Sequence, residues 1–131
     1  MAHAEGSFTV KSWDENTYQE LGGGAKLTKA TVAYAFEGDL TAAGTWDAVM
    51  CYRTDGTAAF TGFQQTSGQL AGRQGSFVLQ ADGEFVDGEA RCRWQVVPGS
   101  ATGDLAGLTG AGTAVATHTP PGTFALDYTL A

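Results

Sequence analysis

Basic residues are scarce in this sequence. Of its 131 residues, 7 are Lys or Arg and 14 are Asp or Glu, which gives a formal net charge of −7. Nucleic acids and anionic membrane surfaces are bound through clustered cations, because clustered cations displace condensed counterions. The charge balance therefore predicts neither a nucleic-acid partner nor a membrane partner.

Cysteine and histidine are also rare. The two cysteines, Cys51 and Cys92, lie far apart and form no C-x-x-C pair, which leaves too few soft ligands for a zinc site. We expect His3 to lie in a frayed terminus and His118 to lie in a loop beside "TPPG". These positions predict no metal site, and no sequence motif indicates a cofactor.

Long hydrophobic runs are absent. No stretch approaches the roughly 18 consecutive apolar residues that read as a membrane span. The start, "MAHAEGSF", has no basic n-region and no apolar h-region, so no signal peptide is predicted. The expected location is therefore cytoplasmic.

Helical periodicity is missing as well, and period-two alternation takes its place. In "GSFTVKSW" it directs Phe8 and Val10 to one face. Three further segments alternate in the same way. Their predicted buried faces are Ala30, Val32, Tyr34 and Phe36 in the first, Trp46, Ala48, Met50 and Tyr52 in the second, and Ala90, Cys92, Trp94 and Val96 in the third. "DG" at Asp55–Gly56 and "ADG" at Ala81–Gly83 are typical of turns between such strands.

About eight strands joined by short links account for the whole chain and leave no room for a crossover helix. A twisted meander with one apolar face loses its unpaired edges by closing on itself. We therefore expect an all-β fold, a closed antiparallel eight-stranded barrel that forms a single domain over residues 1–131. A two-sheet sandwich is the alternative.

The segment "VVPGSATGDLAGLTGAG" is dense in glycine, with Gly99, Gly103, Gly107, Gly110 and Gly112. A phosphate-binding loop would need Gly-Lys-Ser/Thr followed by a helix, and a dinucleotide site would need a strand before it and a helix after it. Neither context is present. The segment instead predicts a wide loop after Pro98, followed by a strand that bends or is approached closely by its neighbours.

Two linked motifs carry a family resemblance. "LAGRQGSFVLQADG" and "VVPGSATGDLAGLTG", with "KLTKATV" and "FEGDL" upstream and "LDY" at the end, resemble a bacterial family of unknown function, DUF3224. That family is similar to the allene-oxide-cyclase and dirigent barrels, which implies a closed antiparallel barrel that is often oligomeric. The family often has a glutamate where this chain has Gln64, and an amide orients a ligand but is no useful base.

The apolar faces, taken as inward, predict an aromatic lining that suits one hydrophobic or planar ligand. The predicted ligand-binding residues are Tyr34, Trp46, Met50, Tyr52, Phe60, Gln64, Cys92, Trp94 and Tyr128. Barrels of this strand number either fill their interior with side chains or hold one small ligand, and both outcomes stay open.

The first functional hypothesis is therefore a small-molecule-binding barrel without chemistry. The alternatives are an isomerase, lyase or cyclase that uses Tyr34, Tyr52 or Tyr128 as proton donor, and a structural oligomer with a filled core. No Ser-His-Asp order or G-x-S-x-G elbow is present, so no catalytic residue is assigned and enzymatic activity stays open. Small outward residues at Thr31, Ala33 and Ala35 predict a homo-oligomer, a dimer or trimer.

Overall fold

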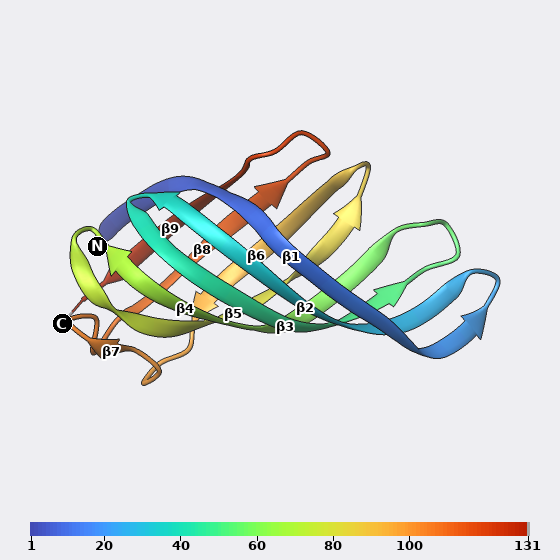
Figure 1. Ribbon diagram of the computed structural model, residues 1–131, viewed down its shortest axis with the longest axis horizontal. Coiled ribbons are helices and arrows are strands. Elements are labelled where there is room, and N and C mark those ends of the chain that lie inside the picture. The colour runs from blue at the N-terminus through green and yellow to red at the C-terminus, as the bar shows by residue number, and fades with distance from the viewer. Residues whose placement is uncertain (131) are drawn as a thin grey trace.

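The computed structural model describes residues 1–130, and within them every regular element is a β-strand (Figure 1). The strands are β1 (Ala2–Gly22), β2 (Ala25–Gly38), β3 (Leu40–Tyr52), β4 (Ala58–Leu70), β5 (Arg73–Val86), β6 (Glu89–Val96), β7 (Thr102–Gly103), β8 (Thr109–Ala116) and β9 (Gly122–Thr129). No helix in this part of the chain is long and apolar enough to cross a membrane.

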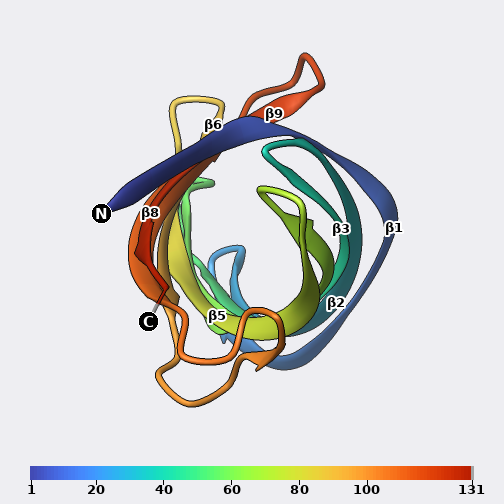
Figure 2. The ribbon, with the colours of Figure 1, turned by 90° about the vertical axis from the view of Figure 1, so that its left-hand side faces the viewer.

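All nine strands belong to one antiparallel sheet, in which eight strands form a hydrogen-bonded ring. The sheet order is β4-β3-β2-β1-β9-β8-β6-β5-β7, and β4 also pairs with β5, which joins the two ends of the order. Viewed from one end, the strands surround a common interior (Figure 2). The prediction of an all-β fold is confirmed, and one continuous sheet replaces the two sheets of the alternative. The two-residue β7 adds a ninth strand outside the ring.

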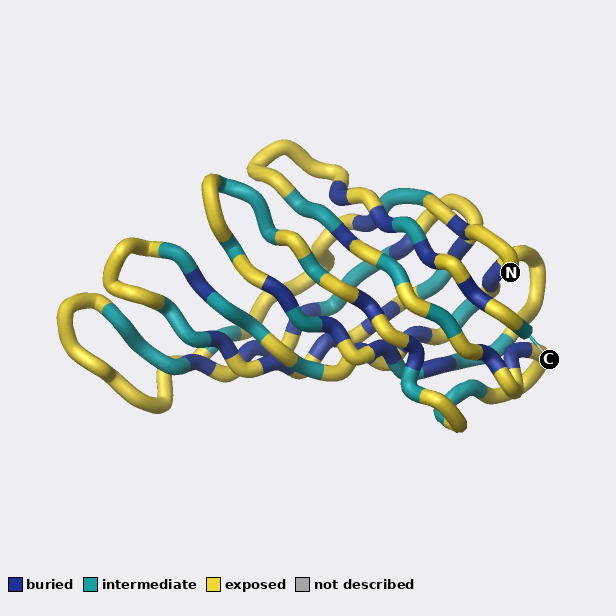
Figure 3. Tube along the Cα trace, turned by 180° about the vertical axis from the view of Figure 1, so that it is seen from behind, coloured by how far each residue is buried: buried dark blue, intermediate teal, exposed yellow. Residues whose placement is uncertain are grey.

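Alternation along the strands separates an inner face from an outer one (Figure 3). On β2, Ala30, Val32 and Phe36 are buried, whereas Lys29 and Glu37 are exposed. The same pattern buries alternate residues of β3 and of the end of β6. The predicted buried faces of these strands are therefore confirmed for most of their members, and the apolar core occupies the inside of the ring.

The two ends of the ring differ. At the end where both termini lie, leucines with at most 1% exposure fill the interior: Leu40, Leu70, Leu79, Leu105 and Leu108. Leu105 and Leu108 come from the glycine-rich loop between β7 and β8, which β7 attaches to β5 through the pairing of Ser76 with Thr102. The wide loop predicted after Pro98 is thus present, and it closes this end. The opposite end carries the β1–β2, β3–β4, β5–β6 and β8–β9 turns (Figure 1).

The predicted turn at Ala81–Gly83 is wrong. β5 runs through these residues without interruption, and the chain reverses at Asp87 and Gly88, where φ is +55° and +77°. Positive φ at both central positions is the requirement of a tight hairpin turn whose twist matches the strands. Gly83 is present for another reason: a Cβ there would clash with the carbonyl oxygen of Arg91 on β6.

The N-terminus is also better ordered than predicted. Ala2 to Phe8 pair with Gly122 to Tyr128 on β9, so His3 does not lie in a frayed terminus. Its Nδ1 lies 2.7 Å from Asp127 Oδ1 and its Nε2 lies 3.1 Å from Glu5 Oε2. These two hydrogen bonds to carboxylates raise the pKa of His3 above its usual value.

A β-bulge in β1 changes which residues face inward. Val10 pairs with Tyr34 and Ser12 pairs with Ala33, which leaves Lys11 without a partner on β2. A single extra residue shifts the alternation by one position. Beyond the bulge, Trp13 and Glu15 therefore lie opposite the inward-facing Val32 and Ala30.

Candidate functional site

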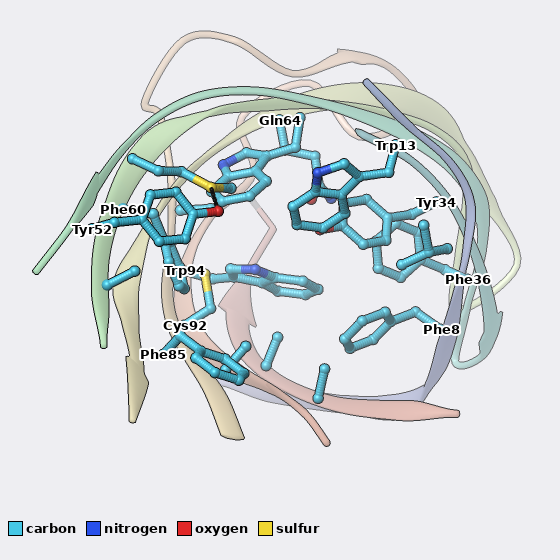
Figure 4. A pocket seen from close by; sticks show the side chains of 18 residues that line it. Phe8, Trp13, Tyr34, Phe36, Tyr52, Phe60, Gln64, Phe85, Cys92 and Trp94 are labelled. Carbon is cyan, nitrogen blue, oxygen red and sulfur yellow. Dashed lines mark hydrogen bonds between the residues drawn. The ribbon is translucent and has the colours of Figure 1, made fainter. Parts of the chain in front are cut away.

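The ring encloses a cavity of about 330 Å³ toward the end that carries the four turns. We call it the inner cavity (Figure 4). Its 18 lining residues come from seven of the eight strands of the ring, β1 to β6 and β8. They are Phe8, Val10, Trp13, Tyr34, Phe36, Trp46, Met50, Tyr52, Ala58, Phe60, Gln64, Ala81, Phe85, Ala90, Cys92, Trp94, Ala114 and Ala116.

The structure brings the predicted ligand-binding residues together with one exception. Tyr34, Trp46, Met50, Tyr52, Phe60, Gln64, Cys92 and Trp94 all line the inner cavity. Tyr128 is buried but lies outside this lining, because β9 carries it toward the end that the leucines fill. It pairs with Ala2 on one side and with Gly110 on the other. Tyr128 is therefore part of the core and not of the cavity wall.

An aromatic cluster forms one wall of the cavity. The ring of Phe36 lies 5.8 to 5.9 Å, centroid to centroid, from the rings of Phe8, Tyr34, Trp94 and Phe124. Trp94 and Phe124 stack at 5.6 Å. Edge-to-face and stacked pairs of this kind are favourable beyond the area that they bury. Of these rings, Phe8, Tyr34, Phe36 and Trp94 line the cavity (Figure 4).

The inner part of the cavity carries two polar side chains. Gln64 is 3% exposed, and its Nε2 donates a hydrogen bond to Thr66 Oγ1 at 3.2 Å. Trp46, which pairs with Gln64 across β3 and β4, is 5% exposed, and its Nε1 has no hydrogen-bond partner among the described residues. Its ring meets Phe60 edge-on, with centroids 5.2 Å apart. The uncharged polar groups of the cavity lining therefore include the amide of Gln64 and the hydroxyl of Tyr34.

Solvent reaches the cavity beside β1, where the lining residues Val10 and Trp13 are each 49% exposed. Next to this opening Glu15 accepts three hydrogen bonds. Tyr52 Oη and Thr28 Oγ1 each donate to Glu15 Oε2 at 2.6 Å, and Trp13 Nε1 donates to Oε1 at 2.9 Å. These contacts fix the Tyr52 hydroxyl at the rim of the cavity.

Sequence reasoning missed Trp13 and Glu15 as members of this site. Uninterrupted alternation from Phe8 and Val10 places residues 12 and 14 on the inner face, and the bulge at Lys11 replaces them with 13 and 15. The only local signal is the polar run "KSWDEN", which interrupts the alternation. Such an interruption does not reveal where a bulge lies.

The Glu15–Tyr52 pair keeps its proton on the phenol. Burial alone raises the pKa of Glu15, but hydrogen bonds from Thr28, Tyr52 and Trp13 and the charge of Lys26 outweigh it and lower the pKa below the usual value. Burial of Tyr52, its hydrogen bond to Glu15 and the negative charge of Glu15 all raise the pKa of Tyr52. At neutral pH, Glu15 is therefore an ionised acceptor and Tyr52 a neutral donor.

Burial also keeps the other titratable groups of the cavity neutral. It raises the pKa of Cys92 to about 12, with a further contribution from the charge of Asp82. It raises the pKa of Tyr34 as well, and the nearby Cys92 adds to this effect. A thiol with such a pKa is a poor nucleophile at neutral pH, because the thiolate is the reactive form.

The shifted pKa of Cys92 predicts a loss of stability at high pH. Above pH 9, its usual value, the unfolded chain loses the thiol proton while the folded chain keeps it until about pH 12. This group alone then lowers the free energy of unfolding by about 1.4 kcal/mol per pH unit between those values. Urea unfolding at pH 8, 9, 10 and 11 should give a shallower decline for Cys92→Ala than for the parent. Equal declines would contradict this explanation.

The described residues contain no group of three or more His, Cys, Asp or Glu side chains that could hold a metal ion. Charged side chains are also missing from the lining of the inner cavity, as far as the structure describes the chain. The arrangement can therefore hold a neutral ligand by apolar contact and by a small number of hydrogen bonds.

Comparison with known proteins adds the family. Residues 4–128 match the model of a family described as "Protein of unknown function (DUF3224)". A crystal structure of a protein of unknown function from that family, from Shewanella oneidensis MR-1, is similar over 100% of this chain and 98% of the other, with a TM-score of 0.85 and 31% sequence identity. No curated protein matches the chain.

Proposed function

The chain belongs to the DUF3224 family, and because that description carries no activity, we propose a function from the inner cavity itself. The protein is a binding protein that encloses one neutral, hydrophobic or aromatic small molecule. The observation that carries this proposal is a cavity of about 330 Å³ inside the ring, lined by aromatic and aliphatic side chains and by no charged one among the described residues.

The size and chemistry of the cavity suit a compact ligand. An apolar cavity of about 150 Å³ binds benzene, so a volume of 330 Å³ accommodates a one- or two-ring molecule. The hydrophobic effect favours such a ligand, and burying an uncompensated charge among these side chains would be costly. Fixed rings such as Phe36 and Trp94 offer edges and faces for aromatic contact.

In the proposed function the ring acts as a closed barrel of the allene-oxide-cyclase-like type. The pairing of β4 with β5, which extends over thirteen residue pairs from Ala58–Phe85 to Leu70–Arg73, supports this description. Eight-stranded barrels have an interior wide enough for one small ligand. Within the described residues, the leucines fill the terminal end, and the opening beside β1 gives access to the cavity.

Isomerase, lyase or cyclase activity is the second candidate, and one observation favours it: Tyr52 and Glu15 share a hydrogen bond of 2.6 Å at the rim of the cavity. A tyrosine bonded to a carboxylate can supply a proton to a bound substrate. The directions of the two pKa shifts oppose this role, because they hold the proton on Tyr52 and keep Glu15 ionised. Binding without chemistry is therefore the first candidate.

A cavity-filling variant tests the binding function. Ala114 is buried and lines the inner cavity from β8, so the ring of Ala114→Phe would occupy the ligand volume. We expect the parent to bind the neutral two-ring fluorophore 6-propionyl-2-(dimethylamino)naphthalene with an increase in its emission. Ala114→Phe should lose at least about 2 kcal/mol of affinity, which is roughly 30-fold in Kd.

The matched control is Thr113→Phe. Thr113 precedes Ala114 on the same strand but is exposed on the outer face, so its variant adds the same ring without filling the cavity. It should bind the fluorophore as the parent does. Equal affinity in all three proteins would place the fluorophore elsewhere and reject the cavity as the binding site, and circular dichroism verifies that both variants are folded.

A further inference from the structure

Two side-chain oxygen atoms in the lining of the inner cavity have no hydrogen-bond partner among residues 1–130. One is the hydroxyl oxygen of Tyr34, Oη, and the other is the amide oxygen of Gln64, Oε1, since the hydrogen bond of the Gln64 side chain leaves from Nε2 to Thr66. Both oxygens keep accessible surface, because in this part of the chain Trp46 Nε1 is the one fully buried side-chain nitrogen or oxygen without a partner. Polar groups inside a protein are rarely left unpaired without a reason.

The accessible surface of these oxygens opens into the inner cavity. Gln64 is 3% exposed, Tyr34 is partly buried, and both line the cavity. The ring of Tyr34 points from β2 toward the middle of the cavity (Figure 4). Its hydroxyl lies near enough to Cys92 on β6 for the thiol to raise its pKa, although three strands separate β2 from β6 in either direction around the ring. The Tyr34 hydroxyl therefore faces across the cavity.

A glycine brings the amide of Gln64 next to Tyr34. Gly44 on β3 pairs with Tyr34 on one side and with Thr66 on the other. A Cβ at Gly44 would lie 3.1 Å from Gln64 Nε2 and 3.4 Å from the amide carbon, so the amide occupies the space that a side chain would fill. The Gln64 amide and the Tyr34 hydroxyl point into the same part of the cavity (Figure 4). One polar group of a ligand can therefore meet both.

The chemistry of the two groups limits what this polar group can be. A tyrosine hydroxyl donates and accepts, whereas an amide oxygen only accepts. A ligand hydroxyl complements both groups, because it has one proton to donate and lone pairs to accept with. A carbonyl would leave Gln64 Oε1 without a donor. A carboxylate would bring a charge to a lining that, within the described residues, contains no cation.

We propose that the ligand of the inner cavity is a neutral aromatic molecule with a hydroxyl group, which donates a hydrogen bond to Gln64 Oε1 and accepts one from Tyr34 Oη. This inference rests on the proposed binding function and adds the ligand class and its orientation. The aromatic part of the ligand contacts the apolar side chains that line the rest of the cavity, such as Phe60 and Trp94.

Two probes of nearly equal size test the inference. In p-cresol a hydroxyl group replaces one methyl group of p-xylene, and both molecules are neutral at neutral pH. A purely apolar cavity should prefer p-xylene, because burying a hydroxyl without a partner is costly. We expect the parent to show the reverse order and to bind p-cresol at least about threefold more tightly, the low end for net hydrogen bonds. Chemical-shift titrations of the ¹⁵N-labelled protein give both dissociation constants.

Single variants assign the preference to the two groups. Tyr34→Phe keeps the ring and leaves no other group unpaired, so it should fold. The ratio of the p-xylene to the p-cresol dissociation constant should fall about three- to tenfold in this variant, the range for one net hydrogen bond. Gln64→Met, with a side chain of similar length, should lower the same ratio. The matched control is Tyr128→Phe, which removes the hydroxyl of a buried tyrosine outside the cavity lining and should leave the ratio unchanged.

The outcomes separate the two proposals. Ala114→Phe should weaken the binding of both probes, which places them in the inner cavity. If it does so but the parent binds p-xylene at least as tightly as p-cresol, the hydroxyl inference is wrong while the binding function stands. A water molecule held by Tyr34 and Gln64 would give this result. If neither probe binds, or both bind Ala114→Phe as they bind the parent, the binding function fails and the inference fails with it.

The tyrosine variants decide the assignment even if Gln64→Met does not fold. A preference for p-cresol that Tyr34→Phe does not reduce, or that Tyr128→Phe reduces as much, would overturn the inference.

Discussion

Phe36→Ala is expected to lower the free energy of unfolding by about 3–5 kcal/mol, the range for removing a fully buried phenylalanine. Phe36 is 2% exposed on β2 and contacts four other rings, more than any other aromatic side chain in the described residues. The lost contacts are not regained, because backbone pairing on both sides of β2 prevents the wall from collapsing. Urea unfolding followed by tryptophan fluorescence measures the change.

Phe63→Ala is the matched control for this prediction. Phe63 lies on the outer face of β4 and is 56% exposed, so its removal should change the unfolding free energy by less than about 1 kcal/mol. Comparable losses in the two variants would mean that the aromatic cluster does not stabilise the ring in the way described here.

Gly83→Ala is expected to cost about 3 kcal/mol, the upper end of the usual range for overpacking. A methyl group at this position would clash with the carbonyl oxygen of Arg91 and would also meet the carbonyl carbon of that residue at 2.8 Å. Both obstacles are backbone atoms of β6, so no side-chain rotation relieves the contact. The pairing of β5 with β6 must open locally, at the place where Cys92 and Phe60 flank Gly83.

Gln80→Ala on the same strand provides the comparison. Gln80 is exposed and its side chain makes one hydrogen bond, at 3.3 Å, to Asp82. Its loss should stay within about 0.5 kcal/mol. Thermal and urea unfolding of both variants decide the matter: if Gly83→Ala is as stable as Gln80→Ala, β5 and β6 do not approach as closely as described.

The inner faces of most strands could be predicted because alternation is a strong and local signal. β2, β3 and β6 bury the residues that a period of two selects, and this places Tyr34, Trp46 and Trp94 on one surface. Once the strands form a ring, that surface becomes the cavity wall. The candidate site was predictable to the extent that it depends on strand pattern alone.

The parts of the candidate site that the sequence does not predict depend on departures from this strand alternation. The bulge at Lys11 brings Glu15 next to Tyr52, which lies 37 positions later in the chain. No local feature of the sequence specifies this contact between Glu15 and Tyr52, because it follows from a register shift in β1 and from the pairing of β2 with β3. Regular alternation predicts Tyr128 in the site, but alternation does not indicate the depth at which a residue lies along the ring.

The turn at Asp87–Gly88 illustrates a further limit. "ADG" and "VDG" offer the same local chemistry five residues apart, so composition alone does not choose between them. The choice is made by β5 and β6, which stay paired from Leu79–Val96 to Val86–Glu89. The predicted oligomer and the predicted location concern surfaces and surroundings outside a single chain, and both stay predictions.

The leucines that fill the terminal end close the interior of the ring at that end. Under the proposed binding function, a ligand therefore enters and leaves by the same opening beside β1. The end of the ligand that lies at this opening stays nearest to water, so the proposal expects substituents to be tolerated at that end. A dye or an affinity tag on such a ligand should therefore be attached at the end that lies at the opening.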